Sequence, residues 1–149
     1  MIFSEQITCL LDEKPLAYIA TADNIKKPNI SLKGIIDYNK DKGIIYFLDL
    51  FSKKTRTNLK INKQISIAVV NEKSVSAFQF KGTTEMINNG PLFEKYAENW
   101  DEKQTDAFRE EINWNFLTSF SNAAKEILLP APKYLVKVTV TEIINLAPF

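Results

Sequence analysis

The segment at residues 48–62, LDLFSKKTRTNLKIN, carries the side chains in this chain best suited to bind an anion. An apolar strand leads directly into Ser52-Lys53-Lys54-Thr55, and from residue 50 to residue 71 there are five basic residues and no acidic one. A helix that begins at Ser52 adds free backbone N–H groups and the positive end of its dipole to these lysines. Such a corner suits a phosphate dianion, and the alternative is that the lysines are ordinary solvated surface charge.

Lys33, in the sequence SLKG, is a second source of positive charge for the same corner. A hairpin loop at residues 38–43 is expected to place the strand of Lys33 beside the strand at residues 43–50. Lys33 and Lys54 are therefore predicted to converge on one phosphate. The chain contains neither GxxxxGK[ST] nor GxGxxG, so a P-loop or a Rossmann dinucleotide site is not expected.

The composition excludes several classes of protein. The chain has 149 residues, no histidine, one cysteine and a net charge of +1. Without histidine there is no Ser-His-Asp triad, no HExxH zinc site and no haem held by a protein histidine. The near-neutral charge balance disfavours a nucleic-acid binder, and no apolar run approaches the ~20 residues of a membrane span.

The compartment and the role of the cysteine are inferred from the same features. One cysteine cannot form a disulfide framework, and the N-terminus lacks the basic region of a signal peptide, so a cytoplasmic location is expected. Cys9 lies in the apolar context ITCLL and is predicted to be a buried structural thiol.

Hydrophobic periodicity predicts how the chain is divided into elements. A helix is expected at residues 4–11, capped by Ser4, with Ile7, Leu10 and Leu11 on its buried face. Strands are expected at 16–21, 29–37, 43–50, 64–71, 76–87 and 134–144, and helices at 52–61, 91–100 and 102–126. Phe78 and Phe80 are expected to pack inward and to leave Gln79 on the opposite face. The three consecutive hairpins favour a small closed antiparallel barrel in a single domain, residues 1–149, over a doubly wound sheet.

Four stretches between residues 16 and 87 resemble the FMN-binding split barrels of the pyridoxamine 5′-phosphate oxidase-like superfamily. They are LAYIAT, KPNISLKG, GIIYFLDLFSKKTRTNLKINKQISIAVV and FQFKGTTEMI, in the order and spacing of that family. The resemblance implies a mostly β fold, a six-stranded antiparallel split β-barrel with flanking helices and a helical insert before the last strand. It also implies a homodimer that holds FMN at its interface and an oxidoreductase acting on a small-molecule substrate.

The resemblance assigns contacts with the cofactor to nine positions and points to no catalytic acid or base. Ser52, Lys53 and Lys54 match a Ser-Arg-Lys phosphate clamp, and Lys33 matches a phosphate or ribityl contact. The other matching positions are Thr55 and Asn58 near the phosphate, Leu48 and Asp49 along the isoalloxazine, and Gln79 at the ring or ribityl chain.

The chain also departs from the true oxidases. They carry Arg where this chain has Pro28, Thr where it has Leu48, and a Trp- and Arg/His-containing final segment where it has VTVTEIINLAPF. Oxidation of pyridoxamine phosphate is therefore not expected. The alternatives are an electron carrier, or a non-catalytic barrel that binds a deazaflavin or haem. A single-strand nucleic-acid surface is disfavoured because no aromatic residues alternate with the basic ones.

Overall fold

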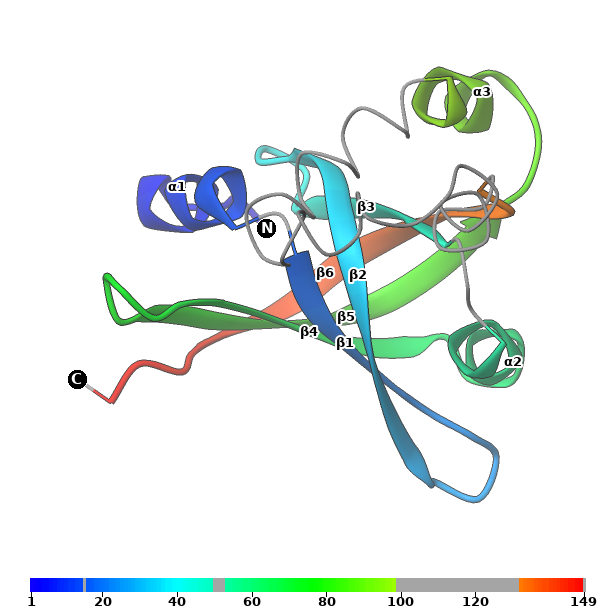
Figure 1. Cartoon of the computed structure of the whole chain (residues 1–149), viewed down its shortest axis with the longest axis horizontal. Coiled ribbons are helices and arrows are strands. Elements are labelled where there is room, and N and C mark those ends of the chain that lie inside the picture. The colour runs from blue at the N-terminus through cyan, green and yellow to red at the C-terminus, as the bar shows by residue number, and fades with distance from the viewer. Residues whose placement is uncertain (15, 50–52, 99–131, 149) are drawn as a thin grey trace, which may run out of the picture.

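The chain folds into a closed antiparallel barrel of six strands (Figure 1). The computed structural model describes residues 1–14, 16–49, 53–98 and 132–148. Around the barrel the strands follow the order β1-β2-β3-β6-β5-β4, which is the predicted split-barrel fold. The strands are β1 (Leu16–Ala22), β2 (Pro28–Asn39), β3 (Ile44–Asp49), β4 (Gln64–Asn71), β5 (Ser76–Ile87) and β6 (Tyr134–Asn145).

Alternating apolar side chains fill the barrel interior. Successive strand residues point to opposite faces, so every second residue of each strand enters the core. Phe78 and Phe80 face inward, as predicted, and Gln79 between them faces outward and is half-buried. The fully buried large side chains include Ile19, Ile45, Phe47, Ile67, Phe80 and Val138, which come from five of the six strands.

Helix α1 (Glu5–Glu13) packs its apolar face against the barrel core. Ser4 is its N-cap and accepts a hydrogen bond from the backbone N–H of Ile7 at 3.4 Å, as predicted. The predicted buried face is also confirmed, with the buried residues Ile7, Leu10 and Leu11.

The prediction that Cys9 is a buried thiol is wrong. Cys9 is exposed, and its thiol donates to Glu13 Oε1 at 3.5 Å. One residue corresponds to about 100° of rotation around a helix, so the neighbour of buried Leu10 faces solvent. The hydrogen bond to Glu13 and the charge of that carboxylate raise the pKa of the Cys9 thiol.

Helix α2 (Lys54–Ile61) contacts β1 and β2, and it lies on the opposite side of the barrel from α1 (Figure 1). It begins later than predicted: its N-cap is Lys53, whose side chain makes no capping hydrogen bond, so the prediction of a Ser52 cap is wrong. Ser52 itself lies outside the described residues. Residues three and four apart share one helical face, and the buried residues of α2 are Thr55, Asn58 and Leu59.

Helix α3 (Pro91–Ala97) covers a second, smaller core on the outside of the barrel. The Tyr96 hydroxyl donates to Asp37 Oδ2 at 2.7 Å, and burial together with this bond raises the pKa of Tyr96. The ring of Tyr96 lies 5.4 Å from that of Tyr46. The predicted helix at residues 102–126 lies outside the described residues, and none of the described helices is long and apolar enough to cross a membrane.

Candidate cofactor site

Six polar side chains from four elements gather at the barrel end that α2 covers, and we call them the mouth cluster. The pairing of β1 with β2 sets Lys33 opposite Ala17 and Ser31 opposite Ile19. Directly opposed residues share a face of the sheet, so Lys33 and Ser31 point into the barrel as Ala17 and Ile19 do. The mouth cluster consists of Thr21, Ser31, Lys33, Asp49, Thr55 and Asn58, all buried except Ser31, which is half-buried.

Two hydrogen bonds in the mouth cluster fasten α2 to the barrel. The hydroxyl groups of Ser31 and Thr55 lie 2.9 Å apart, and Asn58 Nδ2 donates to Thr21 Oγ1 at 3.1 Å. Thr55 and Asn58, which the resemblance places near the phosphate, therefore contact β2 and β1 and hold the first turns of α2 in position. Asn58 Oδ1 is buried and has no hydrogen-bond partner within the described ranges, so we expect water or a ligand to donate to it.

Lys33 forms a buried ion pair with Asp49. Its Nζ lies 3.1 Å from Asp49 Oδ1, and the two side chains are 8% and 3% exposed. The antiparallel pairing of Ile35 with Phe47 explains the contact. Lys33 lies two residues before Ile35 and Asp49 lies two residues after Phe47, so the two side chains lie opposite each other. The structure thus joins two of the predicted site residues to each other.

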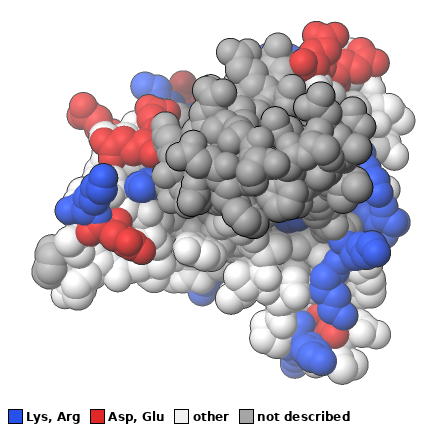
Figure 2. Space-filling model, in the orientation of Figure 1, with Lys and Arg blue, Asp and Glu red and all other residues white. Residues whose placement is uncertain are grey.

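A basic surface lies beside the mouth cluster. Lys53 and Lys54 are exposed at the beginning of α2, whose first turn contains no acidic residue. Figure 2 shows Lys and Arg side chains gathered along the side of the molecule that carries α2 and the hairpin tip between β1 and β2. Arg56, by contrast, lies over the ring of Tyr134, with its guanidinium carbon 5.3 Å from the ring centre.

Two predicted contacts lie away from the mouth cluster. The side chain of Leu48 is 1% exposed and packs in the small core that contains Tyr96 and Leu135. Gln79 is on the outer face of the barrel, where its Nε2 donates to Ser66 Oγ at 2.7 Å. The two side chains therefore face different environments from that of Lys33.

Thr21 and Ser31 belong to the mouth cluster but were missed by the sequence reasoning. Ser31 lies two residues before Lys33 in one strand, so the two-residue period could have placed both on the same face. Thr21 had no such local signal, because its role depends on how closely α2 approaches β1.

The residues present fit the cofactor that the resemblance implies. A phosphate dianion suits the exposed Lys53 and Lys54 together with the free N–H groups of the first turn of α2. A flavin also carries uncharged hydroxyl and carbonyl groups. These suit a site in which Lys33 offers ammonium N–H donors and Asn58 offers a buried acceptor, Oδ1, that has no donor within the described residues.

The six-stranded antiparallel barrel, closed at its mouth by a helix with a basic first turn, defines this protein as a split barrel. The chain belongs to the pyridoxamine 5′-phosphate oxidase family, whose model matches residues 3–144. It is 32% identical over 90 residues to the uncharacterized protein MJ0282 of Methanocaldococcus jannaschii. That match covers 60% of this chain and 59% of the relative, so the chain matches about three fifths of the relative's length.

Solved structures share the fold over nearly the whole chain. HupZ of Group A Streptococcus has a TM-score of 0.71 at 22% identity and is matched over 99% of this chain and 96% of its own. An FMN-binding protein from Syntrophomonas wolfei has a TM-score of 0.63 at 15% identity, with 97% and 86% covered. HutZ, a haem storage protein of Vibrio cholerae (TM-score 0.64, 16% identity), and an F420 reductase (TM-score 0.62, 14% identity) each match over at least 95% of both chains.

Proposed function

We propose that this protein binds FMN and acts as an oxidoreductase on a small-molecule substrate. The observation that carries the proposal is the exposed pair Lys53 and Lys54 at the start of α2, in a helix that the contact between Ser31 and Thr55 holds on the barrel. Docking of the helix holds the free N–H groups of its first turn in position, so they lose little freedom on binding a phosphate, and the two exposed lysines add positive charge beside them. Membership of the pyridoxamine 5′-phosphate oxidase family supports FMN as the molecule whose phosphate binds at this position.

The residues of the chain divide the work of binding. Lys53 and Lys54 hold the phosphate, Thr55 and Asn58 keep α2 in place, and β3 runs along the ring with the inward-facing Asp49, whereas the side chain of Leu48 stays in the small core under α3. Hydride or one-electron transfer is the chemistry that FMN supplies when it is bound. The protein contributes the anchor, the orientation of the ring and the polar groups around it.

We further propose that the protein is a homodimer that pairs through the outer faces of β1, β2 and β4. Four apolar side chains are exposed on these neighbouring strands and form the outer apolar face: Tyr18 (54%), Ile30 (69%), Leu32 (46%) and Val70 (37%). Contiguous exposed apolar side chains mark interaction sites, and this patch suits a second copy of the chain.

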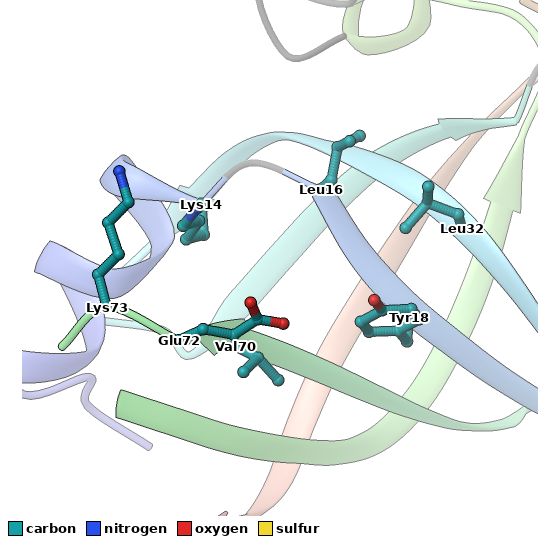
Figure 3. Close-up of a pocket in the computed structure, with 7 residues that line it drawn as sticks. All are labelled: Lys14, Leu16, Tyr18, Leu32, Val70, Glu72 and Lys73. Carbon is teal, nitrogen blue, oxygen red and sulfur yellow. The ribbon is translucent and has the colours of Figure 1, made fainter. Parts of the chain in front are cut away.

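A pocket at one end of the outer apolar face favours a symmetric partner (Figure 3). Its volume is about 370 Å³, and Leu16, Tyr18, Leu32 and Val70 supply its apolar lining. The charged residues in the lining are Lys14, Glu72 and Lys73, which carry both signs. In a two-fold interface the same patch meets itself, so a lysine of one copy can lie against the glutamate of the other.

The position of Gln79 supports FMN at that interface. Ala68 pairs with Tyr18 on one side and with Gln79 on the other, so Gln79 lies beside the outer apolar face. Lys33 points to the inside of the barrel. A flavin held at the mouth of one copy therefore meets Gln79 most directly from the second copy.

The test of the cofactor is the visible spectrum of the purified protein, before and after excess FMN is added and removed by desalting. We expect absorption near ~450 nm, the band of a bound flavin, at about one FMN per chain. Bleaching of this band by NADH or NADPH without oxygen, and its return on adding an electron acceptor, would support the oxidoreductase. A protein that keeps no FMN contradicts the proposal. Retention of F420 or haem in its place would favour the deazaflavin or haem alternative.

The test of the dimer is the mass of the protein in solution by light scattering. We expect twice the chain mass of 17.0 kDa for the native protein. Leu32→Asp, which puts a charge in the outer apolar face, is expected to give monomers. Ile25→Asp is the matched control, because Ile25 is 76% exposed but lies in the β1–β2 loop. A monomeric native protein, or equal effects of both substitutions, would contradict the dimer.

A further inference from the structure

We infer that the tip of the β1–β2 hairpin binds an anionic phospholipid surface, with Ile25 entering the apolar layer and the surrounding lysines contacting the headgroups. The hairpin-tip surface consists of Ile25, Lys26, Lys27, Lys60, Ile61 and Lys63. The cofactor and the dimer use none of these residues, so the inference goes beyond the proposed function and does not depend on it.

The first argument is the position of Ile25. The hairpin of β1 and β2 extends beyond the body of the barrel, on the side away from α1 (Figure 1). β1 ends at Ala22 and β2 begins at Pro28, so Ile25 is the middle residue of the loop, and its side chain is 76% exposed. An apolar side chain at the tip of a projecting loop can enter a flat surface that the barrel itself does not reach.

The second argument is that the loop satisfies its own backbone. Asp23 Oδ1 accepts hydrogen bonds from the N–H groups of Ile25 at 3.0 Å and of Lys27 at 2.9 Å. The N–H of Lys26 donates to the carbonyl of Asp23 at 3.2 Å, and the N–H of Asp23 donates to the carbonyl of Lys27 at 3.1 Å. These bonds hold Lys26 at a φ of 66°, which is uncommon for a residue other than glycine.

Internal hydrogen bonding favours lipid over a protein as the partner of this loop. A backbone N–H that leaves water without a hydrogen bond is costly, and lipid offers it no acceptor. A protein partner can supply acceptors of its own, as it does when a peptide adds to the edge of a sheet. The loop of residues 23–27 therefore meets the stricter requirement, that of an apolar layer.

The third argument is the charge around the tip. Lys26 and Lys27 follow Ile25 directly, and both are exposed. The one acidic residue of the loop, Asp23, is half-buried and bonded to the loop backbone. Lysines beside an exposed apolar side chain suit an anionic membrane, because the ammonium groups stay at the headgroups while the apolar group enters.

The end of α2 extends this positive charge. The helix contacts β1 and β2, and Ala20 of β1 pairs with Ser66 of β4, so the segment joining α2 to β4 lies level with the base of the hairpin. Its exposed residues include Lys60, Ile61 (57%) and Lys63. Figure 2 shows the Lys and Arg side chains gathered along this side, although the chain as a whole has a net charge of only +1. The field of the protein therefore turns this side toward a negatively charged surface.

The experiment measures co-sedimentation of the full chain with lipid vesicles. One set of vesicles is phosphatidylcholine alone, and the other contains about a third phosphatidylglycerol, which gives the surface a negative charge. The variants are Lys26→Glu/Lys27→Glu and Ile25→Ser, and their thermal unfolding curves show whether they are folded. Lys27→Glu alone is the second variant, because it leaves the left-handed position of Lys26 unchanged.

Matched controls lie near the other end of the molecule. Lys40→Glu/Lys42→Glu changes the net charge by the same amount, at two exposed lysines of the loop between β2 and β3. Ile2→Ser removes an apolar side chain that is 74% exposed, close to that of Ile25. The N–H of Phe3 donates to the carbonyl of Lys40 at 2.9 Å, so both controls belong to the region beside α1.

We expect the native protein to sediment with the anionic vesicles and not with phosphatidylcholine alone. Salt at about 1 M shortens the Debye length to about 3 Å and is expected to release it. Lys26→Glu/Lys27→Glu is expected to weaken binding at least about tenfold, since two attractive charges become repulsive. Ile25→Ser is expected to weaken it several-fold, and both controls are expected to bind as the native protein does.

Three results would overturn the inference. They are a native protein that stays in solution with the anionic vesicles, controls that lose as much binding as the tip variants, and tighter binding to soluble polyglutamate than to vesicles. The last result would indicate an acidic protein as the partner. None of them bears on the proposed function, because flavin retention is measured separately.

Discussion

Phe80→Ala is expected to lower the free energy of unfolding by about 3–5 kcal/mol, the range for truncating a buried aromatic residue. Phe80 is fully buried in the barrel, and its ring packs edge-on against that of Phe3 at 5.8 Å. The truncation removes apolar contacts and leaves a cavity where β5 meets the segment before α1. Domains are stable by only about 5–15 kcal/mol, so this single change removes a large part of the total.

Urea unfolding followed by circular dichroism measures this loss. Phe80→Leu keeps most of the apolar volume and is expected to cost clearly less. Lys81→Ala is the surface control: its side chain is 46% exposed and pairs with Glu142 only at 3.8 Å, so a change within about 0.5 kcal/mol is expected. A loss for Phe80→Ala as small as that of the control would contradict the packing described for the core.

Asp49→Ala is expected to destabilise the protein by about 3–5 kcal/mol, because it leaves the Lys33 ammonium buried without its counter-charge. Replacing both partners, as Lys33→Met/Asp49→Leu, removes the unpaired charge and is expected to recover most of this loss. Urea unfolding of the native protein, the two single variants and the double variant forms a cycle that isolates the pair. Additive losses in this cycle would show that Lys33 and Asp49 do not interact in solution.

The local sequence was sufficient to predict the elements whose residues alternate and end at clear turns. The bounds of β4 and β5 agree with the prediction, residues 64–71 and 76–87. Alternating apolar residues specify the strand period, and Asn88-Asn89-Gly90-Pro91 marks the end of β5. The buried face of α1 was predictable for the same reason, because helical periodicity is a property of neighbouring residues. Cys9 shows the limit of this reasoning, since an apolar context in the sequence does not specify the helical face.

The basic corner was also visible in the sequence, because Lys53 and Lys54 are consecutive and follow directly after a strand. The partners of the site residues were not. Lys33 and Asp49 are sixteen residues apart, and Thr21 and Asn58 are thirty-seven apart. Their contacts depend on the register between β2 and β3 and on where α2 rests against the barrel.

The amino-acid sequence thus determined the family, the order of the elements and the presence of a basic helix start, because these features are encoded in residue types and short spacings. The tertiary structure alone decided that the charge of Lys33 is neutralised by Asp49 and that Leu48 is covered by α3. It also decided that Gln79 lies on the other side of the barrel wall from Lys33. The physical reason is that electrostatic pairing and burial are set by distances through space, and in a closed barrel these distances are fixed by strand register and helix docking.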